Sequence, residues 1–138
     1  MKTDAVYARQ SVEKKDSLSI AGQIDLCRRT ADGGELRVYK DAGYSGKNTE
    51  RPAFQQLMKD IRADRIGTLY VYRLDRFSRS VADFGQLWEV LQEHHVEFVS
   101  VNENFDTKTP MGRAMLHIIM VFAQLERETT AERVRDNY

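Results

Sequence analysis

Short apolar runs alternate with amphipathic stretches along most of the 138-residue chain. Four runs are typical of β-strands and lie at Asp4–Ala8, Leu36–Tyr39, Thr68–Tyr72 and Val96–Val101. Between them, apolar residues recur at helical spacing in stretches that begin near Ser19, Pro52 and Val81. The pattern therefore predicts an α/β fold with a mostly parallel central sheet and helices on both faces.

The last segment has a different pattern. Thr109 is a suitable helix cap, and Pro110 is a favoured first helical residue. The apolar positions that follow are spaced in alternating steps of four and three, at Met111, Met115, Ile118, Phe122 and Leu125. This is a narrow heptad seam rather than the wide stripe of a helix that lies on its own sheet. We therefore predict a long C-terminal helix through which copies of the chain assemble, with a continuation beyond Tyr138.

Composition and charge narrow the functional classes. Lys and Arg number 21 and Asp and Glu number 21, so the charge of the whole chain does not favour nucleic-acid binding. The single cysteine, Cys27, excludes an internal disulfide and a multi-cysteine metal site, and it fits a reducing cytoplasm. The longest apolar runs fall far short of the roughly 18–20 residues that a membrane span requires. We expect a single cytoplasmic domain over residues 1–138 without a membrane partner.

Two arginines follow the strand predicted at Thr68–Tyr72. Arg76 and Arg79 lie three residues apart, with Asp75 beside the first. Guanidinium groups bind phosphate oxygens two at a time and stay charged at any working pH. The segment is therefore typical of a phosphate clamp, although a solvated, charged helix start would have the same residues.

Phosphate chemistry without a metal requires a nucleophile and neutralisation of the charge that develops on the phosphoryl oxygens. Ser11 lies just beyond the first strand and has Arg9 nearby. Ligands in α/β folds bind outside the carboxyl ends of the strands, and Ser11, Asp41 and Arg76 each follow such an end. Ser45 competes as nucleophile, and it belongs to the stretch Asp41–Asn48, which is interpreted as a glycine-containing loop.

The serine chemistry lacks an evident general base, because structural or solvated positions fit His94, His95 and His117. Two alternatives to it stay open. A metal-dependent nuclease would need converging carboxylates, which Asp41, Asp75 and Asp106 could supply. A non-enzymatic, phosphate-binding regulatory module of the same architecture would use Ser11 only to cap a loop.

A series of short segments resembles, in order and in approximate spacing, the signatures of the serine recombinase (resolvase/invertase) catalytic domain. They are Tyr7–Ser11, Ser19-Ile20 with Gln23, Asp41–Gly46, Arg51-Pro52, Leu74–Arg79, Thr109–Arg113 and Glu126-Arg127. The forms Ser45-Gly46 with Arg51-Pro52 and Leu74–Arg79 are most similar to the large serine recombinases, which are phage integrases and mobile-element transposases.

The resemblance implies a role for each matching residue. Ser11 would be the nucleophile that forms a 5′-phosphoserine link to DNA and releases a 3′-hydroxyl. Arg9, Arg76 and Arg79 would hold and activate the scissile phosphate, with Asp75 as their partner. Further active-site positions would be Tyr7, Gln23, Arg51, Glu126 and Arg127.

The resemblance also implies the reaction and the partners. The family cuts both strands of two double-stranded DNA sites within a tetramer, exchanges half-sites by subunit rotation and religates them, which integrates or excises a mobile element. It uses no metal, no nucleotide cofactor and no small-molecule substrate. The helix from Thr109 would join the subunits into a dimer or tetramer. DNA-binding domains downstream of this one would explain the zero net charge, and we expect this chain alone to bind DNA poorly.

Overall fold

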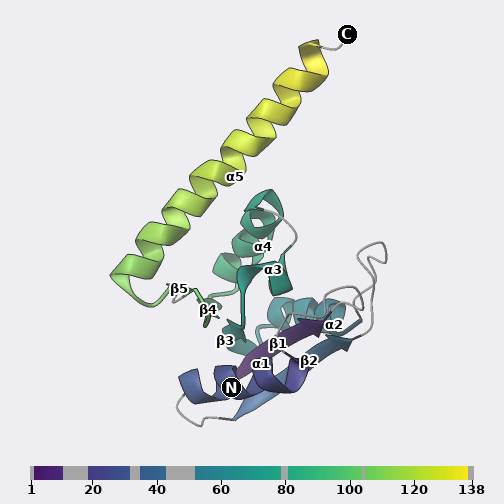
Figure 1. Cartoon of the computed structure of the whole chain (residues 1–138), viewed down its shortest axis with the longest axis vertical. Helices are drawn as coiled ribbons and strands as arrows, with labels where there is room; N and C mark the ends of the chain where they lie inside the picture. The colour runs from purple at the N-terminus through teal and green to yellow at the C-terminus, as the bar shows by residue number, and fades with distance from the viewer. Residues whose placement is uncertain are drawn as a thin grey trace.

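A computed structural model describes residues 2–10, 19–31, 35–42, 52–78, 81–103 and 105–136. In these residues, the strands form one sheet with the order β2-β1-β3-β4-β5 (Figure 1). Their bounds are β1 (Thr3–Gln10), β2 (Leu36–Ala42), β3 (Ile66–Val71), β4 (Glu97–Ser100) and β5 (Phe105–Asp106). The first four are parallel, and β5 is antiparallel to β4. The predicted mostly parallel sheet is confirmed.

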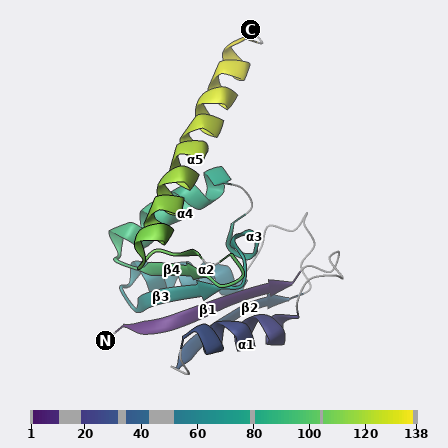
Figure 2. The same ribbon diagram turned by 60° about the vertical axis from the view of Figure 1, so that its left-hand side comes forward.

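The helices cover both faces of this sheet, as the sequence pattern predicts (Figure 2). They are α1 (Ile20–Thr30), α2 (Pro52–Arg62), α3 (Leu74–Phe77), α4 (Val81–Glu93) and α5 (Pro110–Asp136). Side chains alternate between the faces of a strand, so Val6 of β1 packs in a cluster with Cys27 of α1. Its neighbours Ala5 and Tyr7 belong to the larger core, which α2 and α4 cover.

The structure differs from the sequence interpretation at two places in the sheet. Asp41 and Ala42 are not loop residues: β2 continues beside β1 up to the pair of Gln10 and Ala42. Asp41 belongs to the strand because its carboxylate is satisfied inside the protein, as described below, so a charged side chain did not end the strand. The rest of the predicted loop, residues 43–48, lies outside the described residues. The two-residue strand β5 was not predicted, because two residues carry no periodicity.

Asp60 anchors α2 to the neighbouring strands. Its buried carboxylate accepts hydrogen bonds from the Tyr39 hydroxyl and from Gln56 Nε2, the latter at 3.1 Å. Guanidinium nitrogens of Arg37 and Arg65 lie 3.7 and 3.6 Å from the carboxylate oxygens. Burial by itself raises the pKa of the Asp60 carboxyl, but these donors and charges outweigh it and hold the pKa below its usual value. The orientation of α2 on the sheet is therefore well defined.

The long helix α5 has two apolar stripes, and the sequence analysis recognised only one. Leu116 and Ala123 are buried, and Gly85 of α4 comes close to Ala123. Of the predicted seam, Met115 packs partly against the core. The other seam positions are more than half exposed, and so is Val121: Met111 is 72%, Ile118 57%, Val121 65%, Phe122 55% and Leu125 53% exposed. The helix thus docks on its own domain through one stripe and presents a second one outward.

The start of α5 lies directly against β5. Thr109 Oγ1 accepts a hydrogen bond from the backbone N–H of Gly112 at 3.0 Å, so the predicted cap is confirmed. A Cβ atom at position 112 would lie 1.7 Å from the backbone oxygen of Asp106. Only glycine therefore fits in the Thr109–Arg113 segment at this point.

Gly112→Ala is expected to destabilise the protein even though alanine is the better helix former. Helix propensity favours alanine over glycine by about 1 kcal/mol, whereas relief of the clash requires α5 or β5 to shift. We expect the free energy of unfolding to fall by roughly 1–3 kcal/mol, measured by urea unfolding. Gly85→Ala is the milder comparison, because its Cβ would meet a side-chain carbon of Ala123 at 3.1 Å. An increase in stability for Gly112→Ala would contradict the observed contact.

Candidate active site

The carboxyl ends of the parallel strands meet at one edge of the sheet. β1 lies between β2 and β3, and the connections on its two sides cross opposite faces, through α1 and α2. The end of β1 is therefore the point at which the strand order switches, where folds of this kind bind ligands. Arg9 and Asp41 are paired neighbours there, and α3 packs beside β1.

Asp41 is a buried carboxylate that joins β1, β2 and α2. Its Oδ2 accepts from the Tyr7 hydroxyl at 2.8 Å and from the backbone N–H of Phe54 at 3.1 Å. Its Oδ1 accepts from the backbone N–H of Ala53 at 3.0 Å. The first N–H groups of a helix lack partners within the helix, and a carboxylate there is further favoured by the helix dipole. Asp41 therefore holds the start of α2 at the edge of the sheet.

Gln23 joins α1 to the end of β1. The side chain is buried; its Nε2 donates to the backbone oxygen of Arg9 at 3.1 Å, and its Oε1 accepts from the backbone N–H of Arg9 at 3.3 Å. The amide thus pairs with both backbone groups of a single residue, as a neighbouring strand would. This contact fixes the backbone two residues before Ser11.

A continuous row of aromatic rings joins this edge to α3. The Tyr7 ring contacts Phe54 with 5.7 Å between ring centroids, and Phe54 contacts Phe77 at 5.6 Å. Phe77 is fully buried and also contacts Phe98 at 5.3 Å. The single turn α3, which the sequence analysis did not predict as a helix of its own, is therefore held by its last residue. Asp75 and Arg76 are the two middle residues of this turn.

The predicted site residues divide into four groups, the last of which is Glu126 alone. Tyr7 and Arg9 lie on β1 near its carboxyl end, and Gln23 contacts the backbone of Arg9. The positions of Ser11, Arg51 and Arg79, and of the competing Ser45, lie outside the described residues. The structure describes the backbone but not the side chains of Asp75, Arg76 and Arg127.

Within one chain, Glu126 lies apart from the residues at the end of β1. It is exposed on the second half of α5, and that half extends away from the sheet in both views (Figures 1 and 2). Asp41, in contrast, is more important than the sequence indicated: there it stands only as a residue after a strand end and as one of three carboxylates of a possible metal site. Nothing in its local pattern shows that its charge is satisfied by a helix start eleven residues later.

Two other chemistries would need other groups: converging metal ligands, or a reactive thiol. In the ranges that the structure describes, no group of three His, Cys, Asp or Glu side chains is placed to hold a metal ion. Two of the three carboxylates that could form a metal site already accept hydrogen bonds. Asp41 accepts those described above, and Asp106 Oδ1 accepts from the backbone N–H of Lys108 at 2.8 Å. Burial raises the pKa of the Cys27 thiol to about 12, so this thiol stays protonated and is a poor nucleophile.

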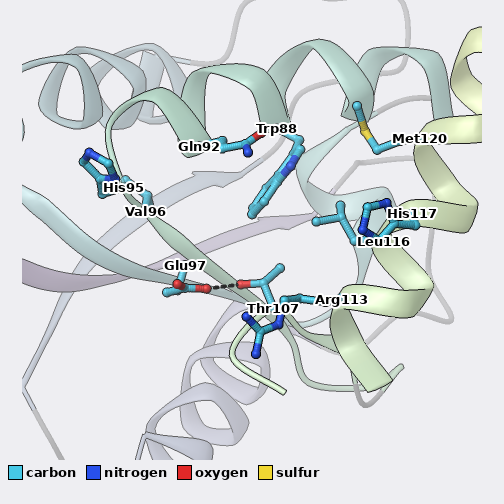
Figure 3. Close-up of a pocket in the computed structure, with 10 residues that line it drawn as sticks. All are labelled: Trp88, Gln92, His95, Val96, Glu97, Thr107, Arg113, Leu116, His117 and Met120. Carbon is cyan, nitrogen blue, oxygen red and sulfur yellow. Dashed lines mark hydrogen bonds between the residues drawn. The ribbon is translucent and has the colours of Figure 1, made fainter. Parts of the chain in front are cut away.

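A pocket of about 410 Å³ lies elsewhere, between α4, α5 and the amino end of β4 (Figure 3). Trp88 and His117 face it from the two helices, and Glu97 and Thr107 line its base, where the Thr107 hydroxyl donates to Glu97. The pocket contains none of the predicted site residues. We therefore place the candidate site at the carboxyl edge of the sheet rather than in this pocket.

Taken together, these features define an α/β domain with a candidate phosphate site at the switch point of its sheet. Residues 5–138 match the family model described as "Resolvase, N terminal domain". The chain belongs to this family, and the resemblance found in its motifs is confirmed. None of the helices in the described ranges combines the length and apolar character that a bilayer crossing requires.

Two of the similar proteins are named as DNA-invertases. A DNA-invertase of Enterobacteria phage P7 is 40% identical over 103 residues, which cover 75% of this chain and 53% of the relative. A probable DNA-invertase of Sinorhizobium fredii is 38% identical over 129 residues, which cover 94% of this chain and 39% of the relative. The chain thus spans about half the length of these relatives or less.

One solved structure has a similar fold over nearly the whole length of this chain. The N-terminal catalytic domain of TP901-1 integrase has a TM-score of 0.80 and 38% sequence identity, and the match covers 94% of this chain and 99% of that one. A resolvase-family site-specific recombinase from Streptococcus pneumoniae has the same TM-score at 24% identity and shows the fold alone.

Proposed function

We propose that this chain is the catalytic domain of a large serine recombinase, which breaks and rejoins DNA during integration or excision of a mobile element. The observation that carries the proposal is the site at the end of β1, where Tyr7 is held by Asp41, Gln23 holds the backbone of Arg9, and α3 packs alongside. The agreement with an integrase catalytic domain over nearly its full length supports the same reading. The active-site residues are those of the motifs: Ser11, Arg9, Arg76, Arg79, Asp75, Tyr7, Gln23, Arg51, Glu126 and Arg127.

The reaction assigns a separate task to the serine and to the arginines. Ser11 Oγ attacks the phosphorus, the bond from phosphorus to the 3′ oxygen breaks, and a 3′-hydroxyl leaves with a proton. The DNA is then held as a 5′-phosphoserine ester. Arg9, Arg76 and Arg79 neutralise the charge that develops on the phosphoryl oxygens. Because the ester conserves the energy of the broken bond, the reverse attack religates DNA without a nucleotide cofactor or a metal.

The proposal is tested by trapping the adduct. The chain is fused at its carboxyl end to a DNA-binding domain of known target, because its own formal net charge is zero and we propose that strong DNA affinity resides outside residues 1–138. Incubation with labelled target DNA, followed by denaturing electrophoresis and peptide mass spectrometry, is expected to show DNA linked to Ser11 with EDTA present. Cleavage that stops when EDTA is added would favour a metal nuclease, and the absence of cleavage would favour a phosphate-binding module.

We also propose that the chain forms a dimer or tetramer through the outward stripe of α5, defined by Met111, Ile118, Val121, Phe122 and Leu125. These side chains are more than half exposed, and a contiguous apolar stripe in water favours association. Because its proposed substrate is double-stranded DNA, we propose that the chain works in the cytoplasm of bacteria or of phage-infected cells. The phage and bacterial relatives support this location.

Ile118→Glu is expected to weaken self-association at least about 10-fold, because association would bury the new carboxylate in the interface without a partner. Sedimentation equilibrium of the 138-residue chain measures the association constant. Gln86→Glu is the matched control: it adds the same charge to an exposed position of α4 outside the stripe. Equal losses for the two variants, or a wild-type chain that stays monomeric at all concentrations, would contradict the proposed interface.

A further inference from the structure

Glu103 accepts two hydrogen bonds on one carboxylate oxygen at the start of α3. Its Oε1 lies 2.7 Å from the backbone nitrogen of Leu74 and 2.6 Å from the hydroxyl of Ser100. Glu103 and Leu74 are 29 positions apart in the chain. The contact therefore exists only because the segment that follows β4 returns beside the end of β3.

The turn α3 needs such a partner. A helix leaves its first N–H groups without partners within the helix, and a helix of four residues is not stable in isolation. Its own N-cap residue, Arg73, makes no side-chain capping hydrogen bond. Glu103 supplies the missing acceptor, and its negative charge is favoured at a helix start. Phe77 anchors the other end of the turn in the core.

The carboxylate of Glu103 is itself held in place. Pairing between β3 and β4 continues past the ends of the strands, because the N–H groups of Val101 and Asn102 donate to the oxygens of Val71 and Tyr72, each at 2.9 Å. Ser100, whose hydroxyl donates to Glu103, is fully buried at the end of β4. The acceptor oxygen is therefore fixed relative to β3 rather than carried by an independent loop.

We propose that Glu103 is a positioning residue for the recombination reaction, acting through α3 on Arg76. This inference rests on the proposed function, because the turn that Glu103 caps carries Asp75 and Arg76 and leads to Arg79. Glu103 itself does not touch the scissile phosphate. It sets where the turn begins, and an error of about 1 Å in the position of a catalytic group costs on the order of 100-fold in rate.

The test compares Glu103→Ala with Glu103→Gln in the DNA-binding fusion described above, at saturating DNA, so that the adduct rate reports the chemical step. We expect the alanine variant to react roughly 10- to 100-fold more slowly. The glutamine variant is expected to recover most of the rate, because an amide oxygen accepts the same two hydrogen bonds. Glu89→Ala, which removes an exposed glutamate of α4, is the matched control and should react as the wild type.

A second measurement separates positioning from general stability. In NMR exchange experiments on the 138-residue chain, the Leu74 amide should exchange at least about 10-fold faster in Glu103→Ala than in the wild type, while amides of β1 are unchanged. Should Glu103→Ala not fold, Ser100→Ala removes the second donor and is expected to slow the reaction to a smaller extent.

The outcomes distinguish the two proposals. Wild-type fusion that forms no adduct would overturn the proposed function. Adduct formation by Glu103→Ala or Ser100→Ala at the wild-type rate would overturn the role of Glu103 alone. An equal loss in the alanine and glutamine variants would also overturn it, because the capping oxygen would then not be what matters.

Discussion

Ser11→Ala is expected to abolish the covalent protein–DNA adduct, with a loss of at least roughly 1,000-fold, the order expected when a nucleophile is removed. Without the hydroxyl oxygen no ester can form, and the arginines alone can only bind the phosphate. The measurement is the rate of adduct formation by the DNA-binding fusion, with DNA binding followed separately by a gel-shift assay. Binding should be unchanged, because the fused domain supplies most of the affinity.

Ser45→Ala is the matched control for this prediction, because Ser45, in the glycine-containing stretch, is the competing nucleophile that the sequence offers. It should form the adduct as the wild type does. If instead Ser11→Ala still forms the adduct while Ser45→Ala does not, the nucleophile has been assigned to the wrong serine. The fold and the family membership would be unaffected by that result.

Asp41→Ala is expected to have the second-largest effect, on stability and on the reaction together. The change leaves the buried Tyr7 hydroxyl and the first N–H groups of α2 without their acceptor, and each unsatisfied buried group costs about 1–3 kcal/mol. Because these costs do not simply add, we expect the free energy of unfolding to fall by roughly 3–5 kcal/mol. Urea unfolding measures this loss, and adduct formation by the folded fraction should fall as well.

Two comparisons make the Asp41 prediction specific. Asp25→Ala removes an exposed aspartate that pairs with Arg29 at 2.9 Å, and surface pairs contribute at most about 1 kcal/mol. Tyr7→Phe removes one donor of the Asp41 cluster and keeps the ring that packs on Phe54, so its effect should be a fraction of the full loss. A loss for Asp41→Ala no larger than that for Asp25→Ala would contradict the role of Asp41 as the residue that joins β1, β2 and α2.

The elements with clear periodicity were predictable from the sequence. The four parallel strands, the cap at Thr109 and the starts of α1 after Ser19 and of α2 at Pro52 all lie where the apolar pattern and the capping chemistry indicate. The sequence pattern did not predict the two shortest elements, and it misplaced one buried carboxylate. β5 has two residues and α3 has four, which is less than one repeat of any pattern, and the end of β2 was placed too early because Asp41 looked like a loop residue.

The candidate site was predictable in part. That Asp41 and the turn with Arg76 lie at the same edge follows from the rule that parallel strands present their carboxyl ends together, whereas Gln23 was indicated only by the resemblance to the family. The contacts that hold them could not be inferred, because Gln23 with Arg9, and Glu103 with Leu74, join residues 14 and 29 positions apart. Local sequence pattern reports on neighbours within a few residues, and these partners are set by how separate elements meet.

The fold class, the order of the main elements and the family were thus predictable from the sequence alone, and the motifs also name the residues that we propose act on a phosphate. Periodic burial and short motifs are local properties, and they are written in consecutive residues. Three features follow from the tertiary structure alone: Asp41 is a buried acceptor for Tyr7 and for the start of α2, Glu103 accepts a hydrogen bond at the start of α3, and α5 docks through one stripe and leaves another exposed. Each of these depends on the satisfaction of a buried or terminal polar group, or of an apolar face, by a partner that is distant in the chain.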